Sequence, residues 1–257
     1  MGTNRLMMGG KAAEVDDYIA YIERTIKSYS NDELETVGAG AFSSCSKLTS
    51  VNLPNCTVID ASAFSSSGLT SIDLPYCTTV GNSGLSYCSK LTSVNLPLCT
   101  SIGDYAFAGS NMTSVNLPAC TSMGSYAFYN SSLTSIDLPA CTKVESSAFS
   151  SCSKLTSVNL PVCTIIKGYA FSSCSNLTSV NVPACTTISD YFAFSDCTSL
   201  TSIDLPSCTE VHYYAFANGN SNLTSIHFAA ANQATIEALN GYSSKFGASN
   251  ATIYFDL

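Results

Sequence analysis

The sequence feature that most constrains this chain is a segment of 21 to 23 residues that recurs along most of its length. One copy, LTSVNLPLCTSIGDYAF, spans residues 91–107, and close copies precede and follow it. A repeat of this length is typical of a solenoid, in which each copy forms one coil and buries its apolar side chains only against neighbouring coils. The copies begin at Leu48, Leu69, Leu91, Met112, Leu133, Leu155, Leu177, Leu200 and Leu223.

Each copy contains the pattern of one short strand and one return segment. Residues 48–59 read L-x-x-V-x-L-x-x-C-x-x-I, which matches the leucine-rich repeat consensus with cysteine at its Asn/Cys position. Residues 50–53 alternate polar and apolar side chains, as a strand with one buried face does. A proline follows these strands, and because proline has no N–H it ends the ladder pairing there.

The return segment carries a phenylalanine that we expect in the core. Ile102 and Phe107 show the spacing, and Leu85 replaces the phenylalanine in one coil. The first half-coil is predicted at Val37 and Phe42, which keep the same spacing, and the repeats then predict nine strands in one parallel sheet. The phenylalanine series consists of Phe42, Phe64, Phe107, Phe128, Phe149, Phe171, Phe194 and Phe216.

The recurring pattern IGxYAFxxCSxLTSVxLP resembles the BspA-like, or Treponema-type, leucine-rich repeats of bacterial surface proteins over residues 37–228. The resemblance implies an α/β repeat fold, a right-handed leucine-rich repeat solenoid with a parallel β-sheet. It also implies adhesion or host contact at a cell surface or on an extracellular or phage particle, and no catalytic residue. The N-terminus shows no apolar stretch of the kind that marks a secretory signal, so this localisation rests on the resemblance alone.

The segment before the repeats is expected to cap the open core of the solenoid, which spans residues 37–228. Residues 1–36 are expected to form an N-terminal helical cap or assembly segment, in which apolar side chains at helical spacing predict an amphipathic helix over about residues 12–29. A second interpretation is that this helix makes the chain oligomerise, because isoleucines occupy heptad positions in it.

The segment after the repeats, residues 229–257, is predicted to form a C-terminal cap. A helix from about Asn232 would place Ile236 and Leu239 against the last coil, and residues 252–255 read as a final strand. The predicted fold therefore has an N-terminal helix at one end of the solenoid and a C-terminal helix–strand cap at the other.

The charge and composition argue against several classes of function. The net charge is −8 and only 11% of the residues are charged, so the chain offers no basic cluster for the phosphates of a nucleic acid. The apolar runs are too short for a membrane-spanning helix, and membrane insertion is not expected. Only two histidines are present, His212 and His227, and no catalytic or nucleotide-binding motif accompanies them. We therefore expect neither an enzyme nor a bound cofactor.

Thirteen cysteines raise the question of a metal or redox site. Eight of them form a row with one member per coil, and a row does not converge as the ligands of a zinc site must. Disulfides between coils are not expected either, because Cβ atoms spaced by about 4.8 Å with parallel directions miss the geometry of a bridge. We predict reduced, buried structural thiols and no metal at Cys56, Cys77, Cys99, Cys120, Cys141, Cys163, Cys185 and Cys208.

The other five cysteines follow a rule of loop length. They occur only where six residues separate the phenylalanine position from the leucine that begins the next copy. The rule predicts a packing role, because the longer loop lets one more side chain turn into the core. These cysteines are Cys45, Cys88, Cys152, Cys174 and Cys197.

One outward position of the strand is Asn or Asp in nearly every coil, beside a row of serines. We call this row the strand strip, and it is our candidate partner-binding surface, although repeat duplication alone would also produce it. Its uniformity suits a repetitive ligand such as a glycan, but it lacks the large aromatic side chains on which sugars stack. The strand strip consists of Asn52, Asp73, Asn95, Asn116, Asp137, Asn159, Asn181 and Asp204.

A second edge of each coil varies in sequence from coil to coil, which suits a specific protein partner. It lies just before a row of tyrosines that we expect to form a half-buried structural ladder. The varied positions are Asp60, Gly81, Gly103, Gly124, Glu145, Lys167, Ser189 and His212. The tyrosines are Tyr105, Tyr126, Tyr169, Tyr191 and Tyr214.

The favoured function is a non-enzymatic recognition or adhesion module of a bacterial surface or a phage tail, which binds a protein partner through the solenoid surface. The alternative is a structural spacer or scaffold that has no ligand of its own. Carbohydrate binding ranks below both of these. Nucleic acid is not expected as a partner, and oligomerisation through the N-terminal helix stays open.

Overall fold

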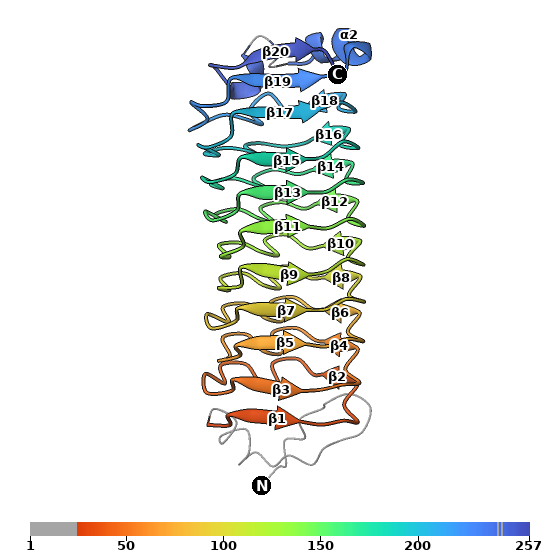
Figure 1. The fold of residues 1–257 in the computed structure, drawn as a ribbon, viewed down its shortest axis with the longest axis vertical. Helices are drawn as coiled ribbons and strands as arrows, with labels where there is room; N and C mark the ends of the chain where they lie inside the picture. The colour runs from red at the N-terminus through yellow and green to blue at the C-terminus, as the bar shows by residue number, and fades with distance from the viewer. Residues whose placement is uncertain (1–24, 241, 243) are drawn as a thin grey trace.

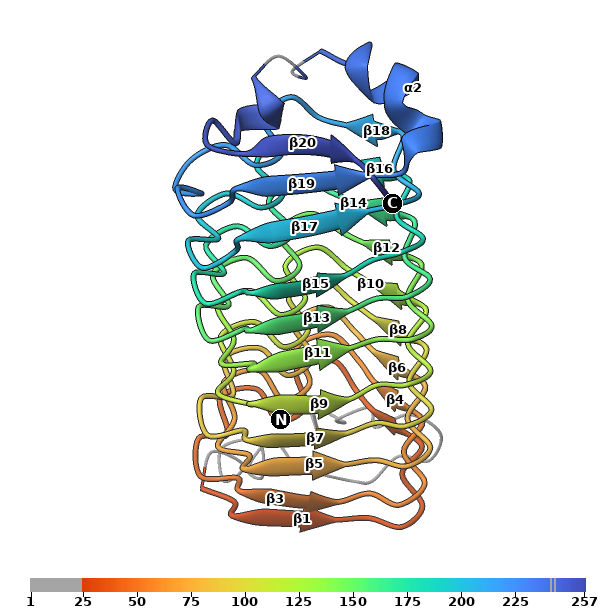
Figure 2. The same cartoon turned by 45° about the horizontal axis from the view of Figure 1, so that its top comes forward.

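The computed structural model describes residues 25–240, 242 and 244–257, and within them the chain winds into a long stack of coils. Successive coils follow one another from the N-terminal to the C-terminal end of the molecule (Figure 1). One row of strands runs along the front, and a second row of shorter strands runs beside it (Figure 2). The predicted parallel solenoid of stacked coils is confirmed.

The front row contains the nine repeat strands, the predicted final strand and one further strand at the N-terminal end. Within the row, strands pair in parallel at matching repeat positions, as Ser93 does with Ser114 and Asn95 with Asn116. The strands are β1 (Ser28–Ser30), β3 (Ser50–Asn52), β5 (Ser71–Asp73), β7 (Ser93–Asn95), β9 (Ser114–Asn116), β11 (Ser135–Asp137), β13 (Ser157–Asn159), β15 (Ser179–Asn181), β17 (Ser202–Leu205), β19 (Ser225–Phe228) and β20 (Thr252–Phe255).

The strand β1 corrects the predicted N-terminal helix at its last residues. Residues 28 and 29 were expected to be helical, but together with Ser30 they form a strand that pairs in parallel with β3. The apolar side chain of Tyr29 packs in the core against Phe42, with ring centroids 5.0 Å apart. The segment Ser-Tyr-Ser has the polar–apolar–polar alternation of the later strands, and this alternation prevails over the helical spacing. Residues 25–27 are not helical either, and the rest of the predicted helix, residues 12–24, lies outside the described residues.

The second row was not predicted, because its strands are only two residues long and show no alternation that marks them in the sequence. They belong to the return segments, and they also pair in parallel with their counterparts in adjacent coils, as Thr187 does with Glu210. The strands are β2 (Thr36–Val37), β4 (Val58–Ile59), β6 (Thr79–Val80), β8 (Ser101–Ile102), β10 (Ser122–Met123), β12 (Lys143–Val144), β14 (Ile165–Ile166), β16 (Thr187–Ile188) and β18 (Glu210–Val211).

Two threonine ladders explain why threonine recurs at fixed places in the repeat. The hydroxyl of Thr92 donates to the carbonyl of Thr70 at 3.1 Å, while the N–H of Thr92 donates to the same carbonyl at 2.9 Å. A second ladder runs after the cysteine position, where the hydroxyl of Thr186 donates to the carbonyl of Thr164 at 3.1 Å. Because each carbonyl has two lone pairs, it can accept both donors and thus joins successive coils twice.

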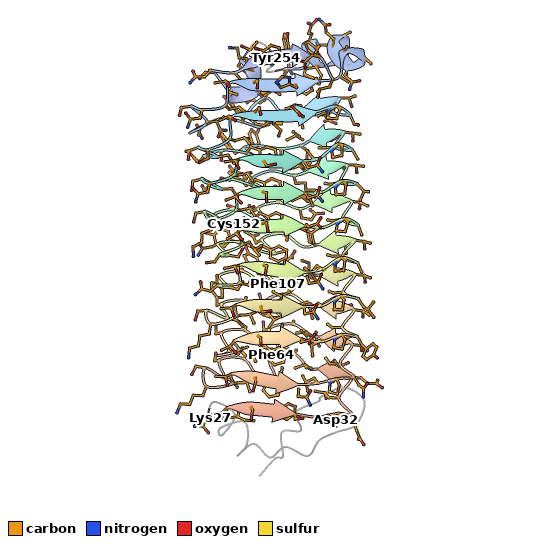
Figure 3. All side chains as sticks on the ribbon, in the orientation of Figure 1. Lys27, Asp32, Phe64, Phe107, Cys152 and Tyr254 are labelled. Carbon is orange, nitrogen blue, oxygen red and sulfur yellow. The ribbon has the colours of Figure 1, made fainter. Side chains whose placement is uncertain are left out.

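The core is a stack of phenylalanine rings that runs along the solenoid. From Phe107 to Phe216, successive rings lie 5.2–5.4 Å apart and are nearly parallel. The stack is interrupted where Leu85, which is fully buried, stands between the coils of Phe64 and Phe107. Figure 3 labels the two phenylalanines that flank this coil. Offset stacking of aromatic rings fits the spacing of the coils, so each ring contacts both of its neighbours.

The C-terminal cap contains both predicted elements. After β19 the chain forms the short helices η1 (Ala230–Asn232) and α2 (Gln233–Glu237), then η2 (Lys245–Gly247), and ends with β20 on the front row. Ile236 is buried and Leu239 packs half-buried against the core. The cap therefore covers the apolar end of the last coil with side chains from α2 and from the residues that follow it.

Candidate functional site

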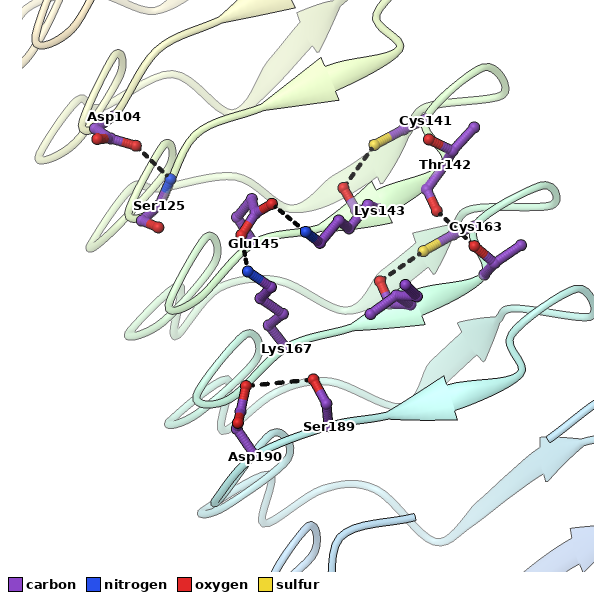
Figure 4. Close-up of polar contacts among 12 residues, drawn as sticks. Asp104, Ser125, Cys141, Thr142, Lys143, Glu145, Cys163, Lys167, Ser189 and Asp190 are labelled. Atoms are coloured by element: carbon purple, nitrogen blue, oxygen red, sulfur yellow. Dashed lines mark hydrogen bonds and ion pairs between the residues drawn. The ribbon is translucent and has the colours of Figure 1, made fainter. Parts of the chain in front are cut away.

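The eight row cysteines are free and buried, and each thiol donates a hydrogen bond to a backbone carbonyl two residues further along. Figure 4 shows two of these bonds, from Cys141 to Lys143 at 3.2 Å and from Cys163 to the next strand at 3.3 Å. Burial raises the pKa of the Cys120 thiol to about 12, and the neighbouring thiols contribute to the rise. Because the thiolate is the reactive form, these sulfurs are poor nucleophiles and poor metal ligands.

The other cysteines occupy an inward position that is polar in every coil. The thiol of Cys88 donates to the carbonyl of Phe64 in the preceding coil at 3.1 Å. In the coil with the longest loop, Asn220 takes this role and donates to Phe194 at 2.7 Å. In coils with the shorter loop the position holds a buried serine, as at Ser110 and Ser131. The inward position is therefore occupied in each of these coils, and the length of the loop correlates with whether its residue is cysteine, serine or asparagine.

The carboxamides of the strand strip bond to one another along the solenoid. Asn95 donates to Asp73 at 2.8 Å, and Asn116 donates to Asn95 at 2.7 Å. A second run lies further along the chain, where Asn159 donates to Asp137 at 2.7 Å and Asn181 donates to Asn159 at 2.6 Å. Asn95 and Asn159 therefore each use one N–H and the carboxamide oxygen inside the ladder, which leaves fewer free groups for a partner.

Each carboxamide run begins with an aspartate, and the front row divides at the same places. The strands form the groups β5-β7-β9, β11-β13-β15 and β17-β19-β20. The first strand of each group contains the aspartate, which is Asp73 in β5, Asp137 in β11 and Asp204 in β17. A carboxylate has no hydrogen to donate, so an aspartate cannot continue the ladder toward the preceding asparagine. The signal is present in the sequence as the repeated order SID, SVN, SVN, which the uniformity of the strand strip had obscured.

We expect Asp137→Asn to raise the free energy of unfolding by about 0.5–1.5 kcal/mol, because the new carboxamide can donate to Asn116 and join two runs. The converse variant, Asn159→Asp, places a second carboxylate beside Asp137, and we expect it to lower the free energy of unfolding by about 1 kcal/mol. Urea denaturation followed by far-ultraviolet circular dichroism measures both changes. If both variants unfold at the same urea concentration as the parent, the aspartates do not limit the ladder.

The tyrosine row is more exposed than the sequence predicted. Tyr105, Tyr169 and Tyr191 are 38%, 45% and 48% exposed. Tyr105 and Tyr126 stack with centroids 4.6 Å apart. The backbone of Tyr105, Tyr126 and Tyr169 is left-handed, with φ of 56°, 59° and 57°, a conformation that disfavours a bulky side chain. The exposure of these side chains means that burial in the core does not explain why tyrosine occurs at these positions. The left-handed backbone does not explain it either, because it disfavours a bulky residue.

The varied positions lie next to these tyrosines, and we call the two rows together the loop edge. At its centre Glu145 accepts hydrogen bonds from Lys143 and Lys167, both at 2.8 Å (Figure 4). Burial opposes ionisation of Glu145, but the hydrogen bonds and charges of the two lysines outweigh it and lower the pKa of the carboxyl. Ion pairs at the surface contribute little to stability, so the cluster mainly sets a local pattern of charge.

At its C-terminal end the loop edge borders a cavity of about 460 Å³. Its walls come from β16, from β18 and the residues after it, and from Leu239 and Asn240 behind α2. The varied positions Ser189 and His212 line this cavity, whereas no residue of the strand strip does. The structure thus separates the two candidate surfaces, because the strip lies on the front row and the cavity lies on the second row.

The repeat and the stacked coils together match a known family. Residues 18–123 and 121–243 match the BspA type leucine rich repeat region, in six copies. The chain belongs to the BspA-type leucine-rich repeat family. The matched residues cover most of the chain, and the resemblance drawn from the repeat pattern is confirmed.

Several solved structures are similar to this BspA-type chain. A leucine-rich cell surface protein from Faecalibacterium prausnitzii is 23% identical, with a TM-score of 0.47, over 90% of this chain and 73% of that one. A leucine-rich repeat protein from Bacteroides ovatus is 18% identical, with a TM-score of 0.40, over 91% and 85%. The pneumococcal vaccine antigen PcpA is 17% identical, with a TM-score of 0.43, over 80% and 60%. No curated protein matches the chain.

The described part of this BspA-type chain brings together no set of three or more histidine, cysteine, aspartate or glutamate side chains that could hold a metal ion. The two histidines lie in different coils. His227 pairs with Asp256 at 2.8 Å and stacks on Tyr254, which Figure 3 labels, whereas His212 lines the cavity. Among the described residues, no helix has the length and apolar character needed to span a bilayer.

Proposed function

We propose that this BspA-type chain is a non-enzymatic recognition or adhesion module of a bacterial surface protein, which binds a protein partner through the surface of its solenoid. Membership of the family supports a surface role. The observation that supports the proposal is the set of exposed tyrosines on the loop edge, of which Tyr105 and Tyr169 are held in left-handed backbone. Bulky residues that are kept in a disfavoured backbone conformation and stay exposed are typical of functional surfaces.

The strand strip remains a second candidate surface. Its asparagines and aspartates are exposed or half-buried, but their carboxamides bond mainly to one another. Protein–protein interfaces are rich in tyrosine, because its ring combines apolar area with a hydroxyl, and the loop edge carries exposed tyrosines. We therefore place the partner on the loop edge first.

The experiment is surface plasmon resonance of the intact chain against immobilised extracellular matrix and serum proteins, with a glycan array alongside. We expect saturable binding to at least one protein. The double variant Tyr105→Ser with Tyr169→Ser should weaken that binding about tenfold. Serine stands at the same left-handed position in other coils, at Ser83 and Ser147, so the variant should keep the fold.

The matched control removes exposed apolar side chains elsewhere. Leu98 and Val162 are 49% and 43% exposed and lie just after the front strands, so Leu98→Ser with Val162→Ser should bind as the parent does. Absence of saturable binding to every protein and glycan would favour the structural spacer. Binding to glycans alone would favour a carbohydrate module.

A further inference from the structure

The second row of strands ends before the front row does. After β18 the chain forms β19, leaves the coil and returns as β20, which extends only the front row. No described strand pairs with the outer edge of β18, whose partner on the other side is β16. Figure 2 shows β18 as the last short strand beside the C-terminal cap. An unpaired strand edge presents backbone groups to which another strand can bond.

One backbone carbonyl on this edge lacks the hydrogen-bond donor that its counterpart in the preceding coil has. In the coil below, the carbonyl of Ile188 accepts a hydrogen bond from the N–H of His212 at 2.9 Å. Its counterpart one coil further on is the carbonyl of Val211, to which no described residue donates. The same edge therefore offers the acceptor that the earlier coils supply to the next, with the exception of the break between β10 and β12 at Met123.

The cavity of about 460 Å³ lies along this edge, with Val211 and Leu239 among its walls. Its volume is that of pockets which bind small ligands or single side chains of a peptide. It exists because the cap covers the last coil with α2 and Leu239 instead of with another strand of the second row. The unpaired edge is thus the wall of a groove with room for an added segment.

The groove carries negative charge. Asp190 and Glu210 line it and are both exposed, and no lysine or arginine is among the described residues that line it. The charge of Lys167 acts on Asp190, but Lys167 is itself bonded to Glu145 at 2.8 Å. Two carboxylates at the mouth of a groove select a cationic occupant by charge complementarity.

Aromatic side chains extend the groove on the loop edge. Tyr213 lines it and lies against Tyr214, with ring centroids 4.0 Å apart. Tyr191 contacts the ring of His212 at 4.4 Å and is exposed. Lysine and arginine side chains bind well to the faces of such rings, since the ring quadrupole attracts a cation.

We infer that this groove docks an extended segment of the protein partner that carries lysine or arginine side chains. The backbone of the segment pairs with β18 as an added strand, and its cationic side chains contact Asp190, Glu210 and the tyrosine rings. The inference rests on the proposed function and adds to it the place and the chemistry of the contact.

The first test selects short random peptides displayed on yeast for binding to the intact chain. We expect the selected peptides to carry lysine or arginine at alternating positions, because alternate side chains of an added strand face the same side. Fluorescence anisotropy with a synthetic peptide of the selected consensus then gives its affinity. Selection without basic residues, or no selection at all, would overturn the inference.

Two changes then separate charge from backbone pairing. The double variant Asp190→Asn with Glu210→Gln should lower the affinity for the consensus peptide about tenfold. The control Asp73→Asn with Asp137→Asn removes the same charge from the strand strip and should leave that affinity unchanged. N-methylation of the peptide on one edge should also weaken binding about tenfold, and methylation on the other edge should not. Equal binding of the groove variant, or indifference to methylation on both edges, would refute the groove.

The outcome for the groove is distinct from the outcome for the proposed function. If a protein from the resonance panel binds the parent and the Asp190→Asn, Glu210→Gln variant equally, the groove is refuted and protein recognition stands. If basic peptides bind the groove but no protein of the panel binds the chain, the groove stands and the proposed partner class is in question. Circular dichroism melts of each variant establish that the fold is retained.

Discussion

Replacing Phe149 by alanine is expected to lower the free energy of unfolding by about 3–5 kcal/mol. The ring is fully buried and stacks on Phe128 at 5.2 Å and on Phe171 at 5.3 Å. Its removal leaves a cavity that the coils cannot close, because their spacing is fixed by ladder hydrogen bonds on both rows. Urea denaturation followed by far-ultraviolet circular dichroism measures the loss.

The matched control is Val162→Ala, which removes an apolar side chain that is 43% exposed and should change stability by less than about 0.5 kcal/mol. A loss below about 1 kcal/mol for Phe149→Ala would mean that the phenylalanine stack does not hold the coils together. Because each coil contacts only its neighbours, local fraying is possible, and fluorescence of the flanking tyrosines should be followed alongside.

Native-state alkylation of the thirteen cysteines is expected to be slower than alkylation of the unfolded chain by about a thousandfold or more. Every thiol is buried, and burial raises the pKa of Cys77, Cys163 and Cys208 to about 12. At pH 8 such a thiol is ionised to roughly one part in ten thousand, and the thiolate is the species that reacts. Mass spectrometry after a pulse of N-ethylmaleimide, with and without urea, measures the difference.

Fast labelling of any row cysteine in the native protein would contradict the buried ladder. A disulfide between cysteines of successive coils would contradict it as well, because the row geometry does not favour a bridge. The serine substitution Cys120→Ser tests the role of the thiol in packing. It should cost about 1–3 kcal/mol if the new hydroxyl does not keep the bond that Cys120 makes to Ser122 at 3.3 Å.

The sequence was informative wherever one repeat determines one coil. The leading leucines, the phenylalanines and the row cysteines could be placed inside because their spacing equals one turn of the solenoid, and all of them are buried. The second row escaped notice because two-residue strands such as β18 leave no periodic pattern. The strand β1 was mistaken for helix because Ile26 and Tyr29 also fit a helical period.

The candidate site was less predictable than the fold. The strand strip was identified from its uniformity, but the sequence did not show that Asn95 and Asn116 bond within the strip. The left-handed backbone of Tyr105 and Tyr169 belongs to turns that the repeat pattern does not show. The groove at β18 depends on where the second row stops, which is a property of the whole stack and of no single copy.

The measurement that tests the account most directly is a charge scan on the protein partner found by surface plasmon resonance. Glu145→Arg with Lys167→Glu reverses charge on the loop edge, and Asp73→Arg with Asp137→Arg reverses it on the strand strip. We predict that the loop-edge pair weakens binding about tenfold while the strip pair binds as the parent does. If both pairs bind with the parent's affinity, neither the charged centre of the loop edge nor the strand strip is where the partner docks.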